Sequence, residues 1–110
     1  MKQYVIDDLR PEDYKTLKKY LDAQYGPVAM DGIYWVAVEP DVLTDAQLEH
    51  KECRPHYFAL DLDQHRLACE LLVRTKNRMR CNCILYATEN QRNWLIGLID
   101  HIFHHLEIKT

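Results

Sequence analysis

The stretch that decides the fold is His56–Ala87, which reads HYFALDLDQHRLACELLVRTKNRMRCNCILYA. Apolar and polar residues alternate along three parts of it, which are separated by Gln64-His65 and by residues 76–78. Alternation with a period of two is typical of β-strands that bury one face. We therefore predict three consecutive antiparallel strands that cover a core with one face only.

The buried faces of these strands also predict their register. If apolar residues pair across both turns, Leu60 lies opposite Cys69, and Val73 lies between His56 and Cys81. Three cysteines then face the core, where cysteine behaves as a small hydrophobic residue. They are Cys69, Cys81 and Cys83.

The rest of the chain predicts three helices and two further strands. Pro11 suits the first turn of a helix, and Gly26-Pro27 suits its end. Thr44 and Thr88 each stand three residues before a glutamine, which is the pattern of a capping box. The expected elements are strands at 4–6 and 32–38 and helices at 11–25, 45–53 and 89–106.

The order β-α-β-α-β-β-β-α predicts an α+β fold. Helices on one face of a mostly antiparallel sheet form a two-layer sandwich. The chain has 110 residues, of which 47% are hydrophobic, and we expect residues 1–110 to form a single domain.

The composition also indicates where the protein works. No apolar run is long enough to span a membrane, and the opening Met1-Lys2-Gln3-Tyr4 lacks the apolar region of a signal peptide. The four cysteines are poorly spaced for disulfides on the predicted strands, so reduced thiols are expected. We therefore expect a cytoplasmic protein without a membrane partner.

Histidine and cysteine recur in His50-x2-Cys53-x2-His56 and again in Cys81-Asn82-Cys83. Both residue types are preferred zinc ligands, so a zinc site is one hypothesis. On the predicted register, however, His56 and Cys81 lie two strands apart, at about 9.6 Å. The sequence therefore favours buried core cysteines and no cofactor. The candidate ligands of the zinc alternative are Cys53, His56, Cys81 and Cys83.

Basic residues gather around the predicted turn at 76–78. Residues 1–65 carry 7 basic and 13 acidic side chains, a net −6, whereas residues 66–110 carry 7 and 4, a net +3. On the predicted register Arg74 faces Arg80, and such a like-charge pair needs an acidic neighbour or a bound anion. An anion or nucleic acid is therefore a possible partner of Arg74, Lys76, Arg78 and Arg80.

Two weaker patterns concern catalysis. His101, His104 and His105 share one side of the last helix, but no motif supplies a nucleophile beside them. Cys53 has basic neighbours and is the one cysteine outside the predicted strands, so it is the candidate for a thiol enzyme. Neither pattern forms a catalytic signature, and the sequence leans against an enzyme.

The last predicted helix, 89–106, is apolar around roughly 200° of its circumference, which is wider than one sheet face usually covers. We expect the uncovered edge to pair two copies of the chain in a dimer. The function that the sequence favours is a small binding or protein-interaction module. The alternatives are an anion or nucleic-acid binder, a zinc protein and a thiol enzyme.

Overall fold

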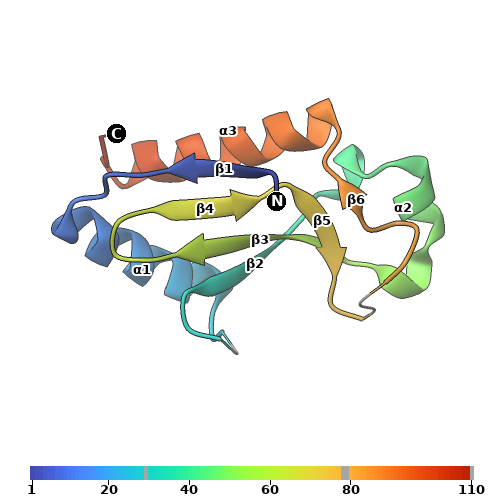
Figure 1. The fold of residues 1–110 in the computed structure, drawn as a ribbon, viewed down its shortest axis with the longest axis horizontal. Coiled ribbons are helices and arrows are strands. Elements are labelled where there is room, and N and C mark those ends of the chain that lie inside the picture. Colours follow the sequence, from blue (N-terminus) through green and yellow to red (C-terminus); the bar gives the residue numbers. More distant parts are fainter. Residues whose placement is uncertain (29, 78–79, 110) are drawn as a thin grey trace.

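A computed structural model describes residues 1–28, 30–77 and 80–109, and it confirms the α+β class. The described residues form a mostly antiparallel sheet of six strands and three helices, in roughly the predicted order (Figure 1). The strands are β1 (Gln3–Ile6), β2 (Ile33–Ala37), β3 (His56–Leu62), β4 (Leu67–Glu70), β5 (Leu72–Thr75) and β6 (Leu85–Tyr86). The helices are α1 (Pro11–Tyr25), α2 (Asp45–Glu49) and α3 (Glu89–His105). Short 3-10 turns, η1 (Pro40–Val42) and η2 (Lys51–Cys53), flank α2.

Strand β3 is the centre of the sheet because it pairs with three other strands. One of its edges carries β2, and the other carries first β4 and then β5. The sheet ends at β1 beyond β4 and at β6 beyond β5. All these pairings are antiparallel.

The predicted strand register is confirmed at one end of β3 and is wrong at the other end. Leu60 lies opposite Cys69 as predicted, but His56 lies opposite Thr75 rather than Val73. The two-residue shift arises at Leu71, which separates β4 from β5. There the backbone N–H of Leu71 donates to the carbonyl of Lys2, outside the pairing with β3 (3.0 Å).

The pairing predicted across residues 76–78 is also wrong, and residue 78 lies outside the described residues. Val73 pairs with Leu85 rather than with Cys81, so its partner lies four residues later in the chain than expected. Asn77 connects the end of β5 to a distant segment, because its side-chain amide donates to the backbone carbonyls of Glu52 (3.1 Å) and Arg54 (3.4 Å). These bonds hold the chain beside η2. Cys81 and Cys83 therefore lie in a loop rather than on a strand.

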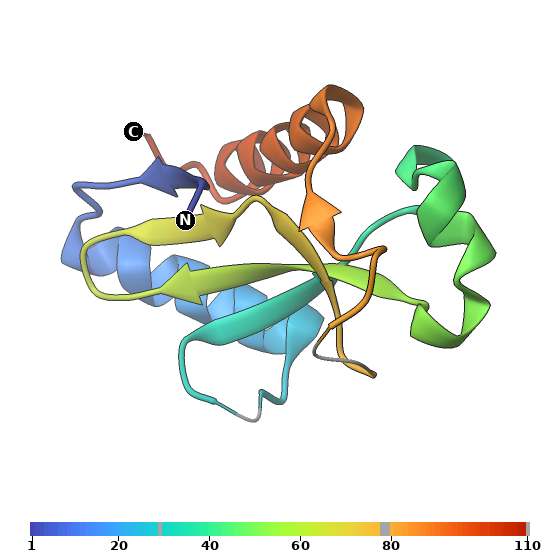
Figure 2. The same cartoon turned by 45° about the vertical axis from the view of Figure 1, so that its right-hand side comes forward.

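Both long helices cover the same face of the sheet. Leu17 and Leu21 of α1 join Leu95 and Ile99 of α3 in one buried cluster with Phe58 of β3. The opposite face of β2 and β3 carries the partly exposed Trp35 and Tyr57. Figures 1 and 2 show α1 behind the strands and α3 along the upper side of the sheet.

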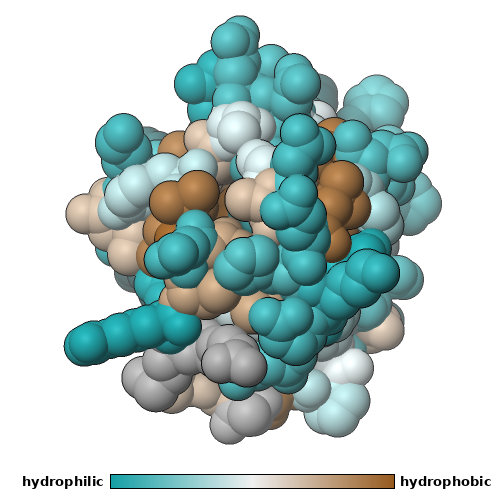
Figure 3. Space-filling view, turned by 90° about the vertical axis from the view of Figure 1, so that its right-hand side faces the viewer, coloured by the Kyte–Doolittle hydropathy of each residue, from teal (hydrophilic) through white to brown (hydrophobic). Residues whose placement is uncertain are grey.

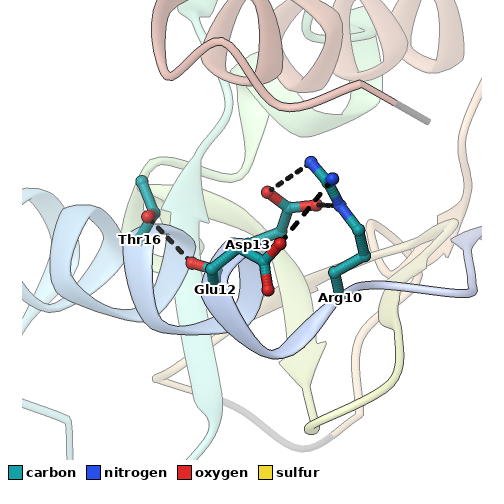
Figure 4. A network of polar contacts seen from close by, with 4 residues as sticks. All are labelled: Arg10, Glu12, Asp13 and Thr16. Atoms are coloured by element: carbon teal, nitrogen blue, oxygen red, sulfur yellow. Dashed lines mark hydrogen bonds and ion pairs between the residues drawn. The ribbon is translucent and has the colours of Figure 1, made fainter.

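Charged residues stabilise the start of α1, where the N-cap, Arg10, makes no side-chain cap bond. Its guanidinium pairs with Glu12 (3.6 Å) and with the buried Asp13 (2.9 Å), while the Thr16 hydroxyl donates to the Glu12 carbonyl (Figure 4). Carboxylates in the first turn also interact favourably with the helix dipole. Acidic residues thus stabilise this helix start.

Both predicted capping boxes are present, and their glutamines meet. Gln47 and Gln91 each accept a bond from the backbone N–H of their own N-cap, Thr44 or Thr88. The Gln91 amide also donates to the Gln47 side-chain oxygen (2.7 Å), and both glutamines are buried. Buried polar groups are tolerated when they are hydrogen-bonded in this way. The contact joins the starts of α2 and α3.

Helix α3 buries more of its apolar surface within one chain than its sequence suggested. Phe103 is buried, Ile96 and Leu98 are half-buried, and Trp94 stacks on Phe58 at 6.2 Å between ring centroids. The dimer through 89–106 therefore stays a prediction. None of the described helices combines the length and the apolar character that crossing a membrane would require.

Replacing Gln91 by Ala should lower the free energy of unfolding by about 1–3 kcal/mol, because it removes the buried hydrogen bond to the Gln47 oxygen and the capping bond from the Thr88 N–H. Urea denaturation measures this change. The matched control is Gln24→Ala on the exposed surface of α1, which should change stability by less than about 0.5 kcal/mol. Equal losses in the two variants would show that the glutamine contact does not stabilise the fold.

Candidate metal centre

Two segments that are far apart in the sequence bring four ligand-type side chains together. The first runs from the end of α2 into η2 and carries His50 and Cys53. The second is the loop before β6, where the N–H of Ile84 bonds the carbonyl of Cys81 and closes a turn (3.1 Å). This turn brings Cys81 and Cys83 to the same side as the first segment.

The ligand atoms of His50, Cys53, Cys81 and Cys83 all lie within 4.8 Å of one another. The Cys81 sulfur is 3.0 Å from Nδ1 of His50 and 3.6 Å from the Cys53 sulfur. In a tetrahedral zinc site with Zn–S bonds of about 2.3 Å, two sulfurs are about 3.8 Å apart. The distance between the Cys53 and Cys81 sulfurs is close to this value, and the four ligand atoms are near enough to one another for a single ion to contact them all.

The site is recessed but reachable. Cys53 and Cys83 are buried, and His50 and Cys81 are partly exposed. The end of the molecule that carries α2 presents mainly hydrophilic residues with scattered hydrophobic patches (Figure 3). A cation can thus enter from the side of His50 and Cys81, while the buried thiols limit the access of water.

The electrostatics of the site favour one thiolate even before a metal binds. Hydrogen bonds from the backbone N–H and the thiol of Cys83 lower the pKa of Cys81 to about 6. Burial raises the pKa of Cys53, and burial together with the Cys81 sulfur raises the pKa of Cys83 to about 12. A bound cation would stabilise the thiolate form of all three.

Neighbouring polar groups position the backbone that carries the ligands. The Gln47 amide donates to the Cys83 carbonyl (3.3 Å), and the Thr75 hydroxyl donates to the Cys53 carbonyl (2.5 Å). Asn77, described above, bonds the carbonyls on either side of Cys53. These hydrogen bonds hold the ligand-bearing segments in place before a metal binds. Hydrogen bonds around the ligands orient them in the same way in other metal sites.

The structure does not place His56 with the three cysteines of the predicted zinc set. His56 is fully buried in β3, and neither ring nitrogen has a hydrogen-bond partner among the described residues. Burial lowers the pKa of this imidazole, with smaller effects from Arg54 and His50. The ligand position expected for His56 is taken by His50, at the end of α2.

The candidate basic site is spread rather than gathered at a hairpin tip. Arg74 pairs with Glu70 (2.9 Å), and the ammonium of Lys76 lies over the rings of Tyr57 (4.6 Å) and Trp35 (5.7 Å). Arg74 does not face Arg80, because the register differs from the predicted one. Arg80 is exposed, and Arg78 lies outside the described residues.

The remaining candidates do not form a site within the described part of the chain. Cys53 is buried with a raised thiol pKa, which is the opposite of the environment of a reactive cysteine. On α3, the rings of His101 and His105 stack at 6.4 Å, and His105 also contacts Tyr20 of α1. These histidines lie on a surface where no nucleophile is placed beside them.

His50 is absent from the zinc ligands predicted from the sequence, although it stands three residues before Cys53, as Cys53 does before His56. The error came from placing Cys81 and Cys83 on a strand next to Val73, which set them nearer to His56. A Cys-x-Cys pair within a turn would have been the signal, but the alternation of apolar and polar residues predicted a strand there. No family model matches the chain, and comparisons with curated proteins and with solved structures find no significant match.

In metal-free protein at pH 7, Cys81 should react with iodoacetamide before the other cysteines. Its pKa of about 6 makes it mostly thiolate at this pH, whereas burial raises the pKa of the Cys69 thiol to about 12. Peptide mass spectrometry after timed labelling measures the four rates. The rate at Cys81 should level off above about pH 7, and a rate that still rises at pH 9, or faster labelling of Cys53, would contradict this assignment.

Proposed function

We propose that this protein is a zinc-binding α+β domain in which His50, Cys53, Cys81 and Cys83 hold one structural zinc ion. The observation that carries the proposal is the mutual approach of the four ligand atoms, all within 4.8 Å. Three thiols and an imidazole match the ligands that zinc prefers in structural sites. Thiolates are soft ligands, so magnesium and calcium are poor fits to this site.

The role of the ion is structural because four protein ligands complete a tetrahedron. A catalytic zinc keeps a position for water or substrate, and the four protein side chains of this site would fill every position. The ion would instead join η2 to the loop before β6. Both segments have few regular backbone pairings, so a metal crosslink would contribute much of their stability.

We further propose that the domain is a cytoplasmic binding module rather than an enzyme. The four cysteines are free thiols in the structure, and the cytoplasm is the compartment that keeps thiols reduced. The metal would fix the loop that follows β5, and this loop borders the exposed face of the sheet. Recognition at that face would then depend on the metal.

Protein purified without chelators should contain about one zinc per chain, measured by elemental analysis and native mass spectrometry. Replacing His50 by Ala should remove most of this zinc because it takes away one of four ligands. A strong chelator should also lower the melting temperature of the wild-type protein, because the binding free energy of a structural metal is part of the folding free energy.

His56→Leu is the control that separates the two possible ligand sets. This variant should keep its zinc and should be at least as stable as the wild type, because it removes a buried imidazole without hydrogen-bond partners among the described residues. Loss of zinc in His56→Leu with retention in His50→Ala would assign the ligand to His56. Protein that contains no zinc and does not change on adding it would rule out the proposed function.

A further inference from the structure

The face of the sheet that the helices leave open contains a continuous groove. Two adjoining cavities, of about 670 and 490 Å³, share a floor of Ile33, Trp35, Met30 and Arg74. The larger volume is in the range of sites for small molecules. Pro27 and Val28, which follow α1, line the larger cavity together with Lys76 and Ile84.

The Trp35 ring lines both cavities of this groove, and the Tyr57 ring lies beside it. Trp35 and Tyr57 meet edge to face, with centroids 5.7 Å apart and planes at 86°, and both rings are partly exposed. The Lys76 ammonium lies over both of them. The four-carbon side chain of this lysine is flexible, so it can leave the two aromatic rings and bring its charge to an incoming anion.

The two ends of the groove differ in charge. Lys76 lines the larger cavity, and no carboxylate lies within ion-pair distance of it among the described residues. The smaller cavity is lined by Asp61 and by Glu70, which is paired with Arg74. A ligand that fits this arrangement has an anionic group at one end, a flat apolar middle and hydrogen-bond donors at the other end.

We propose that this groove binds a nucleoside phosphate, either free or as a unit of a single strand. The phosphate pairs with Lys76, and the base stacks on Trp35. The exocyclic amine of the base donates to the carboxylates of Asp61 or Glu70. Stacking on an aromatic ring accepts any base, and the amine contact adds a preference for adenine or cytosine over uracil.

This inference goes beyond the metal but is connected to it through Ile84. Ile84 follows Cys83 directly and lines the larger cavity beside Lys76. The loop that carries two of the proposed zinc ligands therefore also builds a wall of the groove. Removing the metal should loosen that wall and weaken binding.

Calorimetric titration with adenosine monophosphate and with an eight-residue oligodeoxyadenylate tests the proposal on the full chain. At least one of the two should bind saturably. If the monophosphate binds and the oligomer does not, the ligand of the groove is a free nucleotide. Tighter binding of the oligomer indicates that the ligand is a single strand. Adenosine and ribose 5-phosphate, which each lack one of the recognised groups, should bind at least tenfold more weakly.

Lys76→Gln and Trp35→Ala should each weaken binding at least tenfold, whereas Lys15→Gln on the exposed surface of α1 should not change it. Thermal melts establish that each variant is folded. If Trp35→Ala does not fold, Lys76→Gln alone tests the groove, because Lys76 is exposed and its replacement should not unfold the protein. The proposal is overturned if neither probe binds at millimolar concentration, if adenosine binds as well as its monophosphate, or if Lys76→Gln behaves as Lys15→Gln.

Zinc content measured on the same samples separates this proposal from the first. Protein that lacks zinc yet binds adenosine monophosphate would support the proposed nucleotide site and rule out the proposed zinc site. Protein that contains zinc yet binds neither probe would do the reverse.

Discussion

The structure depends on the way in which β3 shares one of its edges between two strands. The chain from Leu67 to Thr75 runs along that edge but cannot pair with it throughout, because at Leu71 its hydrogen bonds go to Lys2 and Ala87 instead. Beyond Leu71, β5 pairs with β3 in a register that is shifted by two residues from that of β4. That shift determines where β5 ends, and therefore where the following loop starts.

The position of this loop links the core, the candidate metal centre and the groove. Thr75 and Asn77 donate hydrogen bonds to the backbone carbonyls of Cys53 and Glu52 and so connect the end of β5 to η2. The chain then returns past His50 and Cys53 before it pairs again as β6. The hydrogen bond from Gln47 to the Cys83 carbonyl connects this region to the paired capping boxes of α2 and α3. A metal bound there would strengthen contacts that the protein already makes through its backbone.

Local sequence signals predicted most of the fold. Pro11, Gly26-Pro27 and the two capping boxes set the helix ends, because caps and stops act within a few residues of the chain. Alternation in His56–Leu62 and Leu67–Glu70 predicted two paired strands and the position of Leu60 opposite Cys69. The burial of Cys69 in the core followed from the same pattern.

The sequence alone therefore determined the α+β class, the starts of the helices and the core face of the strands at His56–Leu62 and Leu67–Glu70, since each of these follows from short-range periodicity and chain stereochemistry. Only the tertiary structure decided that Cys81 and Cys83 leave the sheet and approach His50 rather than His56. That choice depends on Leu71 bonding Lys2 and on Asn77 bonding residues more than twenty positions earlier. Alternation cannot distinguish a strand from a loop whose polar groups find such distant partners.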